Sequence, residues 1–167
     1  GRRIESGKGD DRSRLGEAIH ACIAADLVYP PKPLNLSEVA AILKRMHATE
    51  DVDAAALYQQ LGALRLWLGT RWPGATPLIE LPVAQLTSEG QHVQGRTDLV
   101  LRTAAGWILM DHKTTPQGRD QWGDLANTHA GQLAAYRDVL QAASGVPVVE
   151  TWLILPVAGA ALRVELS

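Results

Sequence analysis

The chain has 167 residues, of which 46% are hydrophobic, and a formal net charge of −2 at pH 7. This length suits one domain with a real core and is too short for two comfortable ones. The charge excludes a polycation that holds nucleic acid by itself, so we expect another element to deliver any nucleic-acid substrate. The only cysteine is Cys22, which excludes an internal disulfide, a multi-cysteine zinc site and an iron–sulfur cluster held by four cysteines of this chain.

The chain shows neither a membrane-spanning segment nor a signal peptide. No apolar run approaches the roughly 20 residues that a membrane helix needs, and the first residues are polar and charged. We therefore expect a soluble protein in the cytoplasm of a prokaryotic cell. The sequence begins "GRRIESGKGDDRSR" without an initiator methionine, from which we expect a piece of a longer protein.

Residues 13 to about 69 show helical periodicity. Apolar residues recur every three to four positions in "SRLGEAIHACIAADLV", and the following "PPKP" interrupts the pattern. Ser37 is the expected N-cap of a second helix, "EVAAILKRMHA", and Asp51 or Asp53 is that of a third, "AAALYQQLGALRLWLG". We expect this helical half to end at "WPG", residues 72–74.

From Leu78 the periodicity changes from helix to strand. Strands are expected in "LIELPVAQL", "HVQGRTDLVLR" and "WILMDHKT", joined by turns at "SEGQ" and "TAAG". A polar loop, "PQGRDQWGD", leads to a helix from about Asn127 to Ala143, whose end is marked by Ser144, Gly145 and Pro147. Two further strands are expected in "VVETWLIL" and "ALRVEL".

The order of these elements predicts the fold class. Helices come first, then three strands, one helix and two strands, which favours an α/β sandwich with a mostly antiparallel meander and one crossover helix. We expect a single domain over residues 1–167, with a helical half at about 13–70 and a sheet-containing core at about 78–167.

The hairpin "GRTDLVLRTAAGWILMDHKTT" carries charged residues in its apolar strands, where burying a charge is costly unless it is paired or bound to a metal. A turn at residues 103–106 places Asp98 opposite Asp111, whereas a turn one residue longer would offset them. Two facing carboxylates need a cation, and Lys113 shares the face of Asp111. Such a set suits phosphodiester hydrolysis with Mg²⁺ or Mn²⁺. The alternative is an ordinary hairpin whose charges face solvent or form an ion pair.

Motifs in and around this hairpin resemble a known family. The hairpin is similar to the G-x-x-D … D-x-K core of the PD-(D/E)XK nuclease superfamily. In addition, "RLGEAIHA" resembles the G-x-x-x-H helix of its RecB/AddA branch, "QLAAY" resembles the Q-x-x-x-Y helix after the core, and "LIELPV" resembles the E-x-P strand before it. The four motifs occur in the family's order between about Arg14 and Tyr136.

The resemblance implies a role for each matching position. Asp98 and Asp111 would be metal ligands, and Lys113 would be the catalytic lysine. His20 and the backbone carbonyl of His112 would complete the coordination of Mg²⁺ or Mn²⁺, and a histidine ligand fits Mn²⁺ well. The alternative for His20 is a histidine that is hydrogen-bonded within the helices. A Tyr or Phe is common at the position of His112, whose side chain we expect to point away from the metal.

Three other positions are weaker candidates. Gln132 and Tyr136 lie one helical turn apart, where they brace the active-site strands, contact the DNA backbone or form a packing face. Glu80 either supports the metal ligands or is a strand residue that faces solvent. His129 lies one turn before Gln132 and is a low-priority candidate for an approach to the site.

The resemblance also implies the fold and the activity. The fold would have a restriction-endonuclease-like core, with a central mixed sheet flanked by N-terminal helices and one crossover helix. The activity would be that of a metal-dependent DNA exonuclease that acts on DNA ends or single strands in recombination and repair. It would form the C-terminal domain of a UvrD-like helicase, covalently linked to the motor and assembled with a partner recombination subunit.

Branches of this family with an iron–sulfur cluster use four cysteines, so the single cysteine indicates the cluster-free type. Two alternatives stay open for the function. One is a catalytically inactive DNA-binding or interaction module with the same fold, and the other is a standalone structure-specific endonuclease.

Overall fold

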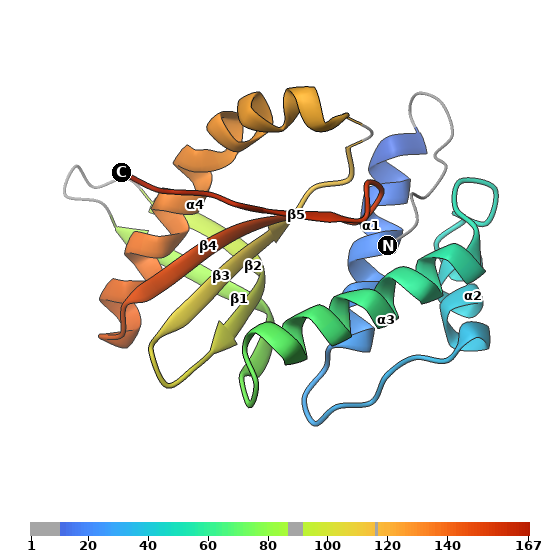
Figure 1. The fold of residues 1–167 in the computed structure, drawn as a ribbon, viewed down its shortest axis with the longest axis horizontal. Helices are drawn as coiled ribbons and strands as arrows, with labels where there is room; N and C mark the ends of the chain where they lie inside the picture. Colours follow the sequence, from blue (N-terminus) through green and yellow to red (C-terminus); the bar gives the residue numbers. More distant parts are fainter. Residues whose placement is uncertain (1–10, 87–91, 116) are drawn as a thin grey trace.

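The computed structural model describes residues 11–86, 92–115 and 117–167. Three helices come first: α1 (Asp11–Asp26), α2 (Leu36–Arg45) and α3 (Ala54–Arg71). They are followed by β1 (Thr76–Leu86), β2 (His92–Arg102), β3 (Trp107–His112), the short 3₁₀ helix η1 (Arg119–Gln121), α4 (Trp122–Ser144), β4 (Val148–Leu155) and β5 (Ala160–Arg163) (Figure 1). None of the helices in these three stretches is long and apolar enough to cross a membrane.

The strands form one mixed sheet in the order β1-β2-β3-β4-β5. The first three make an antiparallel meander, the chain then crosses over through α4 so that β4 is parallel to β3, and β5 returns antiparallel to β4. The helices α1, α2 and α3 pack on one side of the sheet and α4 on the other (Figure 1). The predicted α/β class, with N-terminal helices and a crossover helix flanking a central mixed sheet, is confirmed.

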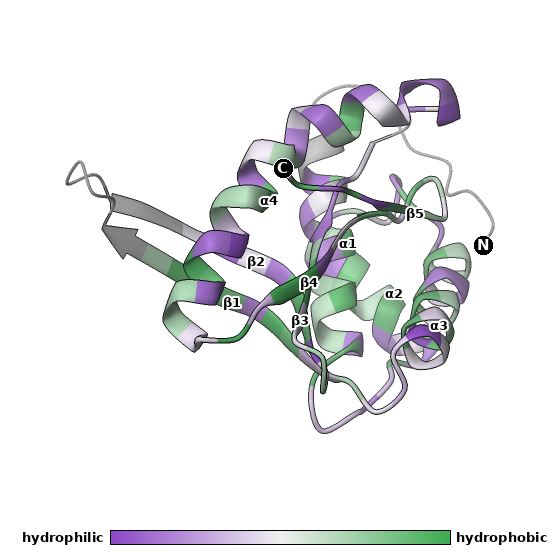
Figure 2. Cartoon of the chain, turned by 60° about the vertical axis from the view of Figure 1, so that its left-hand side comes forward, coloured by the Kyte–Doolittle hydropathy of each residue, from purple (hydrophilic) through white to green (hydrophobic). Residues whose placement is uncertain are grey.

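Each face of the sheet belongs to its own hydrophobic core, because side chains alternate along a strand. Leu99 and Met110 are buried on the side of α1, α2 and α3. Val100 and Leu109 are buried on the side of α4. All six residues of β3 are buried, so this strand lies between both cores. In Figure 2, hydrophobic residues accordingly follow β3, β4 and the helix surfaces that face them.

The N-cap prediction for α2 was wrong. Asn35, and not Ser37, caps this helix: its side chain accepts a hydrogen bond from the backbone N of Glu38 at 3.0 Å, and the Glu38 carboxylate accepts one from the backbone N of Asn35 at 2.9 Å. This reciprocal pair satisfies two backbone donors, which a serine two residues later cannot do. Of the two candidates for α3, Asp53 is the cap, since its carboxylate accepts from the backbone N of Ala55 and of Ala56.

The helix α4 begins at Trp122, earlier than the predicted Asn127, and η1 occupies part of the predicted polar loop. The first turn of α4 contains exposed Gly123 and Asp124, residue types that favour loops, although Trp122 and Leu125 of the same turn pack against the core. The predicted end is confirmed, because Gly145 adopts the left-handed conformation with φ +67° directly after the helix.

The predicted strand positions are close to the observed ones. The bounds of β2 and β4 are those predicted. The first strand begins two residues earlier, at Thr76, the third ends at His112, and the last ends at Arg163 instead of Leu166. The turn predicted at "SEGQ" lies outside the described residues.

Candidate metal centre and active site

The strands β2 and β3 separate where the predicted carboxylate pair lies. Their ladder runs from Arg102 opposite Trp107 to Leu99 opposite Met110, which is the predicted register. Asp98 follows directly beyond the ladder, and its Oδ2 accepts a hydrogen bond from the backbone N of His112 at 2.7 Å. A side-chain carboxylate thus takes the position of a ladder acceptor, and Asp98 is held at the open end of the strand pair.

The carboxyl groups of Asp98 and Asp111 lie within hydrogen-bonding reach of each other. Burial, together with the neighbouring Asp111, raises the pKa of Asp98 to about 8. The pKa of Asp111 is lowered despite its burial, because hydrogen bonds from Asp98 and Lys113 stabilise its charged form. Two carboxylates this close need a proton or a cation between them at neutral pH.

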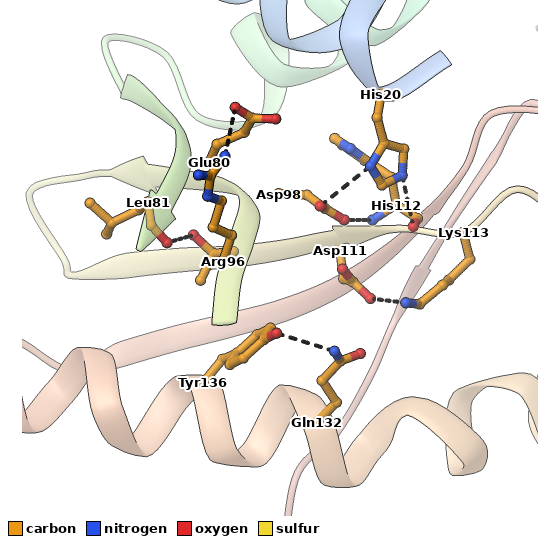
Figure 3. Close-up of polar contacts among 11 residues, drawn as sticks. His20, Glu80, Leu81, Arg96, Asp98, Asp111, His112, Lys113, Gln132 and Tyr136 are labelled. Atoms are coloured by element: carbon orange, nitrogen blue, oxygen red, sulfur yellow. Dashed lines mark hydrogen bonds and ion pairs between the residues drawn. The ribbon is translucent and has the colours of Figure 1, made fainter. Parts of the chain in front are cut away.

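Lys113 is the cation that lies against this pair. Its Nζ is 2.8 Å from Oδ2 of Asp111, and both side chains are largely buried. The backbone N of Lys113 donates to the carbonyl of Ile154 at 2.9 Å, which keeps the chain attached to β4 just after β3 ends. The lysine therefore projects beside the carboxylates from a fixed backbone (Figure 3).

The helix α1 brings His20 over the same strand end (Figure 3). Its Nε2 is 3.2 Å from the carbonyl oxygen of His112, and its Nδ1 is 3.5 Å from Oδ1 of Asp98. A carbonyl oxygen only accepts, so Nε2 carries the proton of the neutral ring and Nδ1 presents its lone pair to Asp98. Burial lowers the pKa of His20, which favours this neutral form.

The glycine of the G-x-x-x-H motif faces the chain directly after β3. Gly16 lies one turn before His20, and a Cβ on Gly16 would lie 3.4 Å from Oγ1 of Thr114. This is an ordinary van der Waals distance, so an alanine would fit and only a larger side chain would meet the chain after β3. The helix α1 therefore packs closely on this segment at the turn before His20.

The side chain of His112 lies on the α1 side of β3. His112 is 3% exposed, and the centroid of its ring is 5.3 Å from the centroid of the His20 ring in an edge-on arrangement. Strand alternation does direct it away from Asp111, as expected, but the opposite face carries His20. A ring nitrogen of His112, a ring nitrogen of His20 and a carboxylate oxygen of Asp98 all lie within 4.8 Å of one another. The expectation that only the carbonyl of His112 faces the site therefore differs from the structure.

The donors at this strand end fit a divalent metal. Carboxylate and carbonyl oxygens suit Mg²⁺ and Mn²⁺, and imidazole nitrogens suit later transition metals. The sequence model of the PD-(D/E)XK nuclease superfamily matches residues 2–166. The chain belongs to this superfamily. Its members are generally nucleases that use divalent metal ions, and the five-stranded sheet with its flanking helices has their restriction-endonuclease-like fold. No curated protein sequence matches the chain.

The glycine of the predicted G-x-x-D motif and the tyrosine of the predicted Q-x-x-x-Y motif meet at β2. Tyr136 on α4 is 9% exposed, and a Cβ on Gly95 would lie 2.5 Å from its hydroxyl oxygen and 3.0 Å or less from two of its ring carbons. The ring therefore occupies the space above Gly95, three residues before Asp98. Gln132 donates from Nε2 to the Tyr136 hydroxyl at 3.2 Å. These contacts fit both the bracing of the strand that carries Asp98 and a helix packing face, and the contact with the DNA backbone stays a prediction.

Glu80 has an unusual backbone conformation for a residue in a strand. It adopts a left-handed conformation with φ +50° within β1, and it interrupts the β1–β2 ladder opposite Asp98, between the pairs Ile79–Leu99 and Leu81–Thr97. Its carboxylate is 3.6 Å from Nη1 of Arg96, and both side chains are more than half exposed. Such strain costs about 1–3 kcal/mol, and an exposed ion pair contributes only about 0–1 kcal/mol. The ion pair does not offset the strain, which is typical of functional sites.

Two residues near the site were missed, or only briefly considered, in the prediction from sequence. Arg96 was not singled out, although its place two residues before Asp98 on the same strand is a usable signal. Burial and then the charge of Lys113 lower the pKa of His129. This ring is therefore within electrostatic reach of the site. Its helical spacing from Gln132 was the signal that pointed to it.

Proposed function

We propose that this domain is a metal-dependent deoxyribonuclease that hydrolyses phosphodiester bonds of DNA with Mg²⁺ or Mn²⁺. The observation that carries the proposal is the buried pair of Asp98 and Asp111, two carboxyl groups that must share a cation or a proton, with Lys113 in contact with one of them. The membership in a superfamily of nucleases supports DNA as the substrate.

Each residue has a defined task in this proposal. A bound divalent metal supplies a Lewis acid that polarises the phosphate and lowers the pKa of a coordinated water. Asp98 and Asp111 provide its oxygen ligands, and His20 adds Nδ1 while its Nε2–H is anchored on the carbonyl of His112, which is itself a candidate ligand. Lys113 orients the attacking water or stabilises the charge that develops on the phosphate.

We infer an exonuclease of the cluster-free RecB/AddA type from the two helix motifs that resemble that branch. The G-x-x-x-H helix contacts the carboxylate site, and the Q-x-x-x-Y helix packs on the strand that carries Asp98. In this proposal residues 1–167 form one nuclease domain of a cytoplasmic helicase–nuclease, and a partner recombination subunit completes the assembly. A covalently linked motor would raise the local DNA concentration, so a domain with a net charge of −2 needs little affinity of its own.

Cleavage assays test the proposal directly. Labelled single-stranded DNA, linear duplex and supercoiled plasmid are incubated with the protein and Mg²⁺ or Mn²⁺, with and without a chelator. We expect degradation that stops with the chelator and falls about a hundredfold or more in Asp98→Ala, Asp111→Ala and Lys113→Ala. Asp138→Ala, an exposed carboxylate on α4 paired with Arg137, is the matched control. Robust cleavage by all three site variants would contradict the proposal.

The same experiments separate the two alternatives. Nicking of supercoiled plasmid without digestion of linear ends would favour a standalone structure-specific endonuclease. Calorimetric titration with Mn²⁺ addresses the inactive module: absence of both binding and cleavage would favour it. The close carboxylate pair speaks against that alternative, because it is unfavourable unless a cation or a proton lies between the two groups.

A further inference from the structure

A second set of donors shares the strand end with the carboxylate pair. It lies on the α1 side of β3 and consists of the two imidazole rings of His20 and His112 and the carboxylate of Asp98, with one ligand atom of each within 4.8 Å of the others. The carboxylate pair of Asp98 and Asp111 offers oxygen only. The two sets therefore differ in chemistry and overlap in Asp98, and the metal of the proposed nuclease site would also draw on His20.

The ring of His112 carries a buried nitrogen that lacks a hydrogen-bond partner among the described residues. Its side chain is buried, with 3% of the residue exposed, and its Nε2 has no hydrogen-bond partner within the described ranges. A buried polar nitrogen of this kind is usually satisfied by a protein group, a water or an ion. The ring of His112 lies edge-on to the ring of His20, and Nδ1 of His20 faces Asp98. A cation held by His20 and Asp98 would therefore lie close to the ring of His112.

The geometry of His20 also points to a ligand. With Nε2 donating to the carbonyl of His112, the Nδ1 lone pair faces Oδ1 of Asp98 at 3.5 Å, a separation that is long for a hydrogen bond. Two ligands bound to one tetrahedral zinc at about 2.0–2.1 Å lie about 3.4 Å apart, close to the observed distance. The hydrogen bond from Nε2 to a carbonyl is the usual way in which a metal-binding histidine is oriented.

We propose that His20, His112 and Asp98 form a binding site for Zn²⁺ on the α1 side of the strand end. Imidazole nitrogens favour zinc over Mg²⁺, and zinc stands above Mn²⁺ in the general order of affinities. Zinc bound there takes Asp98 and His20 from the set that contains Asp111, so it competes with Mg²⁺ or Mn²⁺ and inhibits hydrolysis. The inhibition rests on the proposed nuclease function, whereas the zinc binding does not.

Metal titrations of the chelator-treated protein test the binding. His112→Phe keeps a planar ring beside His20 and the backbone carbonyl but removes the ring nitrogens. We expect it to weaken Zn²⁺ binding in calorimetry by about tenfold or more, with a far smaller change for Mg²⁺. Co²⁺ serves as a coloured substitute, and its visible absorption is expected to weaken and shift in the variant. The matched control, His47→Asn, changes a histidine with φ +56° outside the site and is expected to leave both affinities unchanged.

A measurement on the unaltered protein makes the test independent of how well the variant folds. In protein labelled with ¹⁵N at histidine, saturating Zn²⁺ is expected to shift ring nitrogen resonances of both His20 and His112, and Mg²⁺ is not expected to shift that of His112. No zinc-dependent shift at His112, or equal zinc affinity in folded His112→Phe, would overturn the proposed site.

The inhibition is measured separately. In the Mn²⁺-supported cleavage assay, zinc is expected to inhibit the unaltered protein, and His112→Phe is expected to need about tenfold more zinc for the same fractional inhibition. Equal inhibition of both would overturn the competition. A protein that binds zinc through His112 but cleaves no DNA under any condition would refute the nuclease proposal and leave the zinc site in place.

Discussion

The two sides of the sheet contribute to the candidate site in different ways. On the α4 side, Asp98, Asp111 and Lys113 come from one hairpin and its continuation, and α4 adds a packing brace through Tyr136. On the α1 side, His20 meets β3 across 92 residues of sequence. The acidic half of the site thus follows from local register, and the imidazole half depends on how a distant helix docks.

The largest expected effect is on the hairpin half. Asp111→Asn keeps the shape of the side chain but removes the charge that holds Lys113 and, in our proposal, the metal. We expect nuclease activity to fall about a hundredfold or more, measured as initial rates on labelled linear DNA. The change should leave the fold intact, as judged by circular dichroism. Activity within severalfold of the unaltered protein would show that the hairpin half is not the chemical centre.

The α1 half should respond through metal binding. His20→Gln removes the imidazole from a side chain that is about one-third exposed, so the fold should survive. We expect Mn²⁺ affinity in calorimetry to fall about 10- to 100-fold. Gln132→Ala, on the α4 side, provides the contrast and should leave Mn²⁺ affinity unchanged. Equal losses in the two variants would remove the proposed distinction between the sides.

The brace on the α4 side should appear in stability. Gly95→Ala places a methyl group 2.5 Å from the Tyr136 hydroxyl, and such overpacking costs about 1–3 kcal/mol of unfolding free energy. The measurement is urea unfolding at neutral pH. In a Tyr136→Ala background the same substitution should cost much less, because the atoms that it meets are gone. An equal cost in both backgrounds would place the effect in the backbone of β2 and not in the contact.

The last expected effect is small for each single pH unit and concerns the pH dependence of stability. The pKa of Asp98 is raised to about 8 in the folded protein, so the folded state binds more protons than the unfolded state between about pH 4 and 8. Metal-free protein should therefore lose stability as the pH rises through this window, by at most about 1.4 kcal/mol per pH unit, the value for one proton. Asp98→Asn should flatten this dependence in thermal unfolding. A flat profile in the unaltered protein would contradict the raised pKa.

Much of the fold could be predicted because it depends on local patterns. Strand alternation and turn signals located β2 and β4 to the residue and set the register of β2 against β3. Errors arose where two local signals compete. Asn35 and Ser37 are both good N-caps, and the reciprocal contact with Glu38 decides between them. The first turn of α4 was predicted as a loop because the turn signals of Gly123 and Asp124 outweighed the apolar spacing of Trp122 and Leu125.

Local sequence patterns were enough to predict the acidic hairpin, since a short turn and the two-residue period of a strand bring Asp98 and Asp111 together. The rest of the site depends on the packing of helices against the sheet. The ring of His112 lies beside His20 because α1 packs on that face of β3, and Tyr136 covers Gly95 because α4 packs on the other. Contacts between distant segments depend on how whole faces are buried, and no local period encodes that choice.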